Sequence, residues 1–158
     1  MNLKKLLFSC LLLTVATVTF SQTKITAKCT ADISCSQKFG ITAIDREYTL
    51  VVVYDKNSLK FATNNTSVFS ALNTYKIAKK TDNYIIASST EGNYAFFDVK
   101  RKQLYNIDYY MDRYITAGYG SETNSIKQTV LKMMEILKKG GSQKDAIQEL
   151  IKQAEYSF

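Results

Sequence analysis

YAFFDVKRKQLYNIDY (residues 94–109) is the stretch that decides the fold class of this chain. Two apolar, aromatic-rich runs flank a polar turn at residues 100–103, which is typical of two β-strands joined in a hairpin. In the second run Tyr105, Ile107 and Tyr109 recur at a period of two, as side chains do on one face of a strand. The stretch therefore predicts a pair of antiparallel strands.

The same pattern repeats on the N-terminal side of this hairpin. Apolar runs of strand length, separated by polar turns, occupy residues 48–54, 59–61, 75–77 and 84–87. A strand and its turn repeat about every ten residues, with no helix-length pattern between them, which favours antiparallel neighbours over a parallel sheet. We expect an antiparallel β-meander of about six strands within residues 41–117.

The chain changes period after the meander. Ile126, Val130, Met133 and Leu137 fall on one face of a helix, and a second apolar stripe begins at Ile147. Residues 122–157 therefore predict two amphipathic helices. A serine followed three residues later by a polar partner suggests a capping box at each start, Ser125 with Gln128 and Ser142 with Asp145. The fold class is α+β, with both helices on one sheet face. The alternative is that the two helices, whose polar faces are rich in lysine, lie on a membrane surface.

Residues 1–21 have the layout of a cleavable signal peptide. Lys4 and Lys5 precede an uncharged run that ends at Phe20, and cleavage is expected after Ser21. Lipidation at Cys10 is the alternative, but most of the apolar run follows that residue. The segment resembles a bacterial export signal. We therefore expect an exported protein, periplasmic or secreted, with residues 22–158 as one globular domain and no transmembrane segment after cleavage.

Two cysteines remain after cleavage, Cys29 and Cys35. An even pair in an exported chain predicts a disulfide, here within an N-terminal loop at residues 22–40. The rival interpretation is a metal site. The chain contains no histidine, so two thiols leave too few ligands for that site. We expect no metal and no cofactor.

Motifs that carry catalysis are missing from the sequence. Without histidine the commonest general base is absent, and phosphate-binding glycine loops and serine nucleophile elbows do not occur. We therefore expect no enzymatic activity. A hydrolase that uses two carboxylates is the alternative of another class, with Asp98 and Asp108 on neighbouring strands as its candidate pair.

Two groups of residues are the candidate binding sites. Alternate turns of a meander lie at one end of the sheet, so the basic residues of two turns should form a cationic rim: Lys79, Lys80, Lys100, Arg101 and Lys102. The other group is a tyrosine-rich run with one arginine, the composition of many contact sites: Tyr109, Tyr110, Arg113 and Tyr114. Structural interpretations compete with both, since lysines also solubilise turns and tyrosines also border cores.

The sequence as a whole predicts a small exported module that binds a partner and is not catalytic. The full chain carries a net charge of +7, and removal of Lys4 and Lys5 leaves +5, which permits an anionic surface as partner. An unknown protein is another possible partner. A carrier with a cavity under the helices for a small apolar ligand is the alternative within binding. Export and the modest charge argue against nucleic acid.

Overall fold

The computed structural model describes residues 21–63 and 74–156. The predicted signal peptide, apart from Ser21, lies outside these residues. Within the described part the chain forms eight strands and two helices: β1 (Thr23–Ser36), β2 (Gly40–Tyr54), β3 (Ser58–Thr63), β4 (Thr74–Lys80), β5 (Tyr84–Ser88), β6 (Tyr94–Asp98), β7 (Gln103–Tyr110), β8 (Arg113–Gly120), α2 (Thr123–Lys138) and α3 (Gln143–Tyr156). The antiparallel α+β architecture with two C-terminal helices is confirmed, but the sheet has more strands than the six expected.

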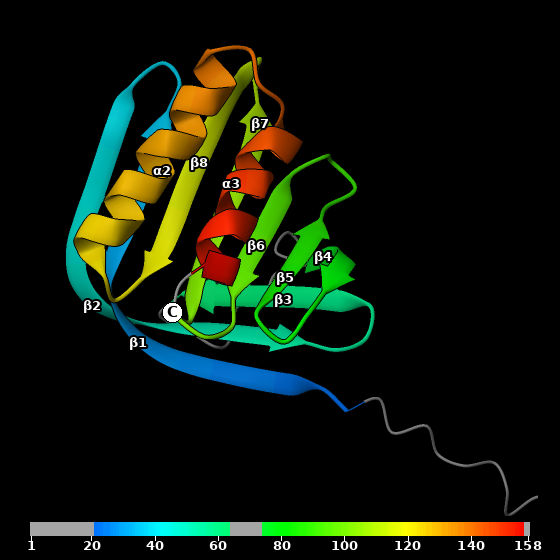
Figure 1. Cartoon of the computed structure of the whole chain (residues 1–158). Coiled ribbons are helices and arrows are strands. Elements are labelled where there is room, and N and C mark those ends of the chain that lie inside the picture. Colours follow the sequence, from blue (N-terminus) through cyan, green and yellow to red (C-terminus); the bar gives the residue numbers. More distant parts are fainter. Residues whose placement is uncertain (1–20, 64–73, 157–158) are drawn as a thin grey trace, which may run out of the picture.

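Every strand pairs antiparallel with the next one along the chain, and the last strand pairs with the first. The closing contact joins Ala31–Ser36 of β1 to Ile115–Gly120 of β8, and the sheet becomes a closed barrel. Figure 1 shows α2 and α3 side by side on the outside of the sheet, with α2 packed on β8 and β1 and α3 packed on β6. The N-terminal half of β1 pairs only with β2 and extends away from the helices.

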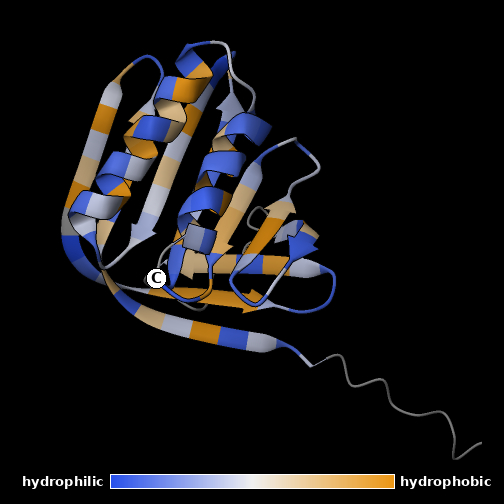
Figure 2. Ribbon diagram, in the orientation of Figure 1, coloured by the Kyte–Doolittle hydropathy of each residue, from blue (hydrophilic) through white to orange (hydrophobic). Residues whose placement is uncertain are grey.

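Both faces of the central strands are buried. One face of β5, β6 and β7 packs against the helices, through Tyr84, Phe96 and Ile107. The opposite face, which includes Ile85 and Phe97, packs against β2 and β3 inside the barrel. Because both faces are covered, these strands lack the polar and apolar alternation of a half-exposed sheet. The outer face of α3 is hydrophilic, as expected for the solvent-facing side of a covering helix (Figure 2).

The register of the β1–β2 ladder shifts near the middle of both strands. Arg46 and Glu47 of β2 stand opposite the single residue Thr30 of β1, which is a β-bulge. Before the bulge Cys29 belongs to the barrel interior, and after it Ala31 belongs to the core under the helices. Cys29 and Ala31 are two residues apart, so the same face of β1 contributes to both cores.

The predicted disulfide between Cys29 and Cys35 is wrong. Both cysteines are free and buried, and they belong to different cores. They lie six residues apart on one extended strand, a span of about 20 Å at 3.3 Å per residue. A disulfide requires Cα atoms within about 7 Å of each other. Most of residues 22–40, expected to form a disulfide loop, is instead the strand β1.

One of the two predicted helix caps is present. Ser142 donates its backbone N–H and its hydroxyl to Asp145, both at 2.7 Å, and the Asp145 amide donates to the Ser142 hydroxyl at 3.2 Å. The box predicted at Ser125 does not form. The first helix begins at Thr123 with Glu122 as its N-cap, so Ser125 already lies inside the first turn.

Candidate functional site

The predicted binding residues lie at two opposite ends of the sheet. The turns β4–β5 and β6–β7 meet at one end, where the Val99 amide donates to the Asn83 carbonyl at 2.9 Å. The turns β1–β2 and β7–β8 meet at the other, where the Gln37 amide donates to the Tyr114 carbonyl at 3.1 Å. We call the first the basic end and the second the aromatic end (Figure 1).

At the basic end two of the predicted lysines cover aromatic rings. Lys79 lies 5.2 Å from the centre of the Tyr84 ring, and Lys80 lies 4.8 Å from that of Tyr54. Lys100 and Lys102 are exposed on the next turn. These contacts join the lysines to the barrel wall, so part of their role is structural.

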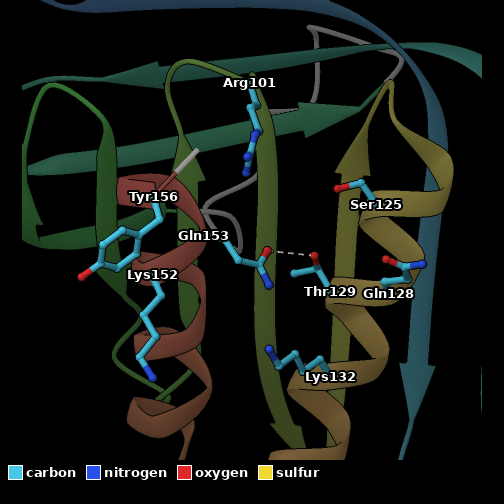
Figure 3. A pocket seen from close by; sticks show the side chains of 8 residues that line it. All are labelled: Arg101, Ser125, Gln128, Thr129, Lys132, Lys152, Gln153 and Tyr156. Carbon is cyan, nitrogen blue, oxygen red and sulfur yellow. Dashed lines mark hydrogen bonds between the residues drawn. The ribbon is translucent and has the colours of Figure 1, made fainter. Parts of the chain in front are cut away.

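Arg101 links the basic end to a groove between the helices. One wall is α2, with Ser125, Gln128, Thr129 and Lys132, and the other is α3, with Lys152, Gln153 and Tyr156. The groove encloses about 510 Å³, and Figure 3 shows Arg101 at the end where the helices meet the turn. Its lining includes three cations and, within the described residues, no carboxylate.

Hydrogen bonds and ion pairs fix the walls of the groove. The Thr129 hydroxyl donates to Gln153 Oε1 at 3.0 Å, which joins the two helices. Lys132 forms an ion pair with Glu149 on α3. Arg101 is held by Asp98, whose carboxylate accepts the Arg101 backbone N–H at 2.9 Å and lies 3.7 Å from the guanidinium.

Sequence reasoning named Arg101 but missed the rest of this groove. The α2 residues recur at i, i+3, i+4 and i+7 from Ser125, the spacing of one helix face. That signal was readable as a polar stripe. What the sequence does not reveal is that α3 lies beside this stripe, and the groove exists only between the two helices.

At the aromatic end the structure brings the four predicted residues together. Tyr109 and Tyr114 are cross-strand partners with ring centres 5.0 Å apart, and Tyr110 pairs with Arg113. Sequence reasoning missed Phe39, which lies 73% exposed on the neighbouring turn, 5.5 Å from the Arg113 guanidinium carbon to the ring centre. Composition alone could not reveal that contact.

The candidate carboxylates Asp98 and Asp108 do not share a site. Asp98 is opposite Gln103 in the β6–β7 ladder, and Asp108 lies five residues further along β7, about 17 Å away. The side-chain amide of Asn106 donates a hydrogen bond to Asp108 Oδ2 at 2.9 Å. Burial raises the pKa of Asp108. No group of three potential metal ligands occurs among the described residues.

No family model matches this chain, and neither does any curated protein or solved structure. No helix in the described part is long and apolar enough to span a membrane. The candidate sites therefore depend on their own geometry.

Proposed function

We propose that this chain is an exported, non-catalytic binding module whose groove between α2 and α3 holds an anionic, hydroxyl-bearing ligand of the acidic-glycan class. The observation that carries the proposal is the groove lining: Arg101, Lys132 and Lys152 with uncharged hydrogen-bonding side chains and no carboxylate among the described residues. Because Arg101 pairs with Asp98 and Lys132 pairs with Glu149, the excess positive charge of the groove lies at Lys152. This charge attracts carboxylate or sulfate groups, and the polar side chains can also bind hydroxyls.

The polar side chains of the groove suit a sugar better than a simple anion. Gln128 and Ser125 on α2 offer an amide and a hydroxyl, and the Tyr156 ring, which is 76% exposed, lies on the opposite helix α3 (Figure 3). Sugars combine hydroxyl groups with apolar ring faces, which hydrogen-bonding side chains and an aromatic ring can both contact. A volume of about 510 Å³ falls within the usual range of about 300–1,000 Å³ for ligand sites.

The packing under the helices gives less support to the alternative function, a carrier with a ligand cavity at that place. Side chains from α2, α3 and the sheet form one continuous buried cluster under the helices, including Met133, Leu150 and Phe96. In contrast, the groove lies on the outer side of the helix layer and faces solvent (Figure 3).

Calorimetric titration with a uronic-acid tetrasaccharide tests the proposal. We expect binding that weakens with added salt, and no binding of a neutral tetrasaccharide. The double variant Arg101→Gln/Lys152→Gln should weaken binding about tenfold or more, because it removes two charge-assisted contacts. Lys127→Gln is the matched control, since Lys127 is an exposed α2 lysine outside the groove lining. Equal losses in the double variant and the control would contradict the proposal.

A further inference from the structure

We propose that the aromatic end docks onto a phospholipid surface, with Phe39, Tyr110 and Met111 entering the headgroup region and Lys38 and Arg113 binding lipid phosphate. This inference concerns the opposite end of the molecule from the groove and does not depend on the proposed function. Its basis is a group of exposed apolar side chains at the tips of two adjoining turns.

The exposed side chains come from hairpins that contact each other. Tyr110 and Met111 are 61% and 67% exposed at the β7–β8 turn, and Phe39 is 73% exposed at the β1–β2 turn. The Gln37 side chain accepts the Tyr114 amide at 3.2 Å, and with the backbone bond between the same residues it fixes one turn against the other. Large apolar groups held together in water indicate a contact surface.

The turn that exposes Met111 has an unfavourable backbone. Met111 and Asp112 have φ of 48° and 58°, and both are the central residues of a two-residue hairpin loop. This is the type I′ conformation, for which Asn-Gly is strongly preferred. Asp tolerates the left-handed region, but Met does not favour it. Met111 thus occupies a backbone conformation that is unfavourable for its residue type. This strain suggests that the Met111 side chain has a function at this position.

Cations lie directly against these apolar groups. The Lys38 ammonium lies 5.3 Å from the centre of the Phe39 ring, and the Arg113 guanidinium carbon lies 5.5 Å from the same centre. A phospholipid presents a phosphate next to apolar chains, which matches this pairing of cation and ring. An anionic lipid surface attracts each of these cations.

The helices add further charge at this end. The α2–α3 connection reaches the aromatic end, where the Gln143 side chain donates to the Ile107 carbonyl at 3.5 Å (Figure 1). The end of α2, the connection and the start of α3 contribute Lys138, Lys139 and Lys144 respectively. The nearby turns and helix ends also carry carboxylates, of which Glu135 pairs with Lys139 and Asp145 caps α3, while Glu91 and Asp112 lie on turns.

The shape of the aromatic end favours a lipid surface over a protein partner. Its most exposed apolar side chains lie at the tips of turns, so they project from the molecule. Protein interfaces instead concentrate their binding energy in packed, flat or pocketed centres. Projecting tips with flanking cations suit insertion between headgroups.

Vesicle sedimentation of the processed, exported chain tests the proposal directly. We expect the chain to sediment with vesicles of phosphatidylethanolamine and phosphatidylglycerol, and less with vesicles of phosphatidylcholine alone. The double variant Met111→Asn/Asp112→Gly removes the apolar tip and installs the preferred type I′ pair. It should melt at a higher temperature than the wild type, yet bind vesicles on the order of tenfold more weakly.

Lys102→Gly is the matched control for this variant. Lys102 also has a left-handed φ, of 55°, but its turn lies at the basic end. The substitution should relieve strain there and leave vesicle binding within about twofold of wild type, because that turn does not reach the lipid. The same loss of binding in the control and the double variant would overturn the proposal.

A fluorescent reporter gives a second readout. The chain contains no tryptophan, so Phe39→Trp places a single indole at the aromatic end. Its emission should shift to shorter wavelength with vesicles and be quenched by brominated acyl chains, while soluble glycerol phosphate should cause neither change. Unchanged emission would overturn the proposal. A dimer in solution without vesicles that dissociates in the Met111→Asn/Asp112→Gly variant would also overturn the proposal. In that case a second copy of the chain would cover the aromatic end.

Discussion

The hydroxyl of Tyr48 in β2 accepts a hydrogen bond from the backbone N–H of Gly120 in β8 at 3.2 Å, although the two strands are not neighbours. The same hydroxyl donates to the carbonyl of Ala31 in β1, the strand between them, at 2.6 Å. This side chain therefore joins three strands at the β-bulge. Burial raises the pKa of Tyr48 well above its ordinary value, so the hydroxyl remains protonated and keeps its donor.

Tyr48→Phe should lower the free energy of unfolding by about 1–3 kcal/mol, because it leaves a buried amide and a buried carbonyl without this partner. Urea denaturation followed by circular dichroism measures the loss. Tyr54→Phe is the control, since it keeps the aromatic ring that contacts Lys80, and it should change stability by less than about 0.5 kcal/mol. A similar loss in both variants would remove the assigned role of Tyr48.

The two cysteines should remain thiols in the folded protein. Intact mass should be the same before and after reduction, because the geometry of β1 keeps Cys29 and Cys35 too far apart to bridge. Burial also raises the pKa of both thiols, which lowers their reactivity. We expect maleimide labelling only after denaturation. A mass lower by two hydrogens would contradict the structure.

Gly118 in β8 gives α2 room to pack. A Cβ at this position would lie 2.7 Å from Ile126 Cγ2 and 2.9 Å from Val130 Cγ2. Gly118→Ala should therefore destabilise the protein by about 1–3 kcal/mol. Adding Val130→Ala removes one of the clashing groups, so the two effects should be less than additive in a double-mutant cycle. Strict additivity would show that the helix does not pack here.

Asp108 should make stability depend on pH. Its pKa is raised by burial above the ordinary value of 3.8, so its contribution to stability is complete below about pH 4. That contribution declines as the pH rises through the folded-state pKa, because the buried group must then ionise. Asp108→Asn should therefore raise the melting temperature at pH 7 and change it little at pH 3.5. Equal melting temperatures for the two proteins at pH 7 would contradict this assignment.

The helices and the inner strands could be predicted because their local patterns match their environment. The stripe from Ile126 to Leu137 is buried as its spacing predicts, and the Ser142–Asp145 cap forms as its residue types predict. The missed strands, β1 and β8, have weaker patterns. Alternation at Ala31, Ile33 and Cys35 was readable but was interpreted as a disulfide loop.

The final strand was harder to predict for a physical reason. β8 contains Gly118 and Gly120, and glycine is depleted in strands. Both glycines are required by the close approach of Ile126 on α2, which is a tertiary contact. The groove and the contact of Phe39 with Arg113 likewise depend on elements far apart in sequence. The local sequence pattern could therefore predict neither the groove nor this contact.

Closure of the sheet also sets an order of events during biogenesis. The ladder between β1 and β8 joins residues more than 75 positions apart, so the first strand has no second partner until the last has been made. Ribosomes add about 5–20 residues per second, so synthesis of the intervening residues takes several seconds. For that time the unpaired edge at Ala31–Ser36 is a potential aggregation site. A chaperone that binds the unfinished chain would therefore be expected to cover this strand.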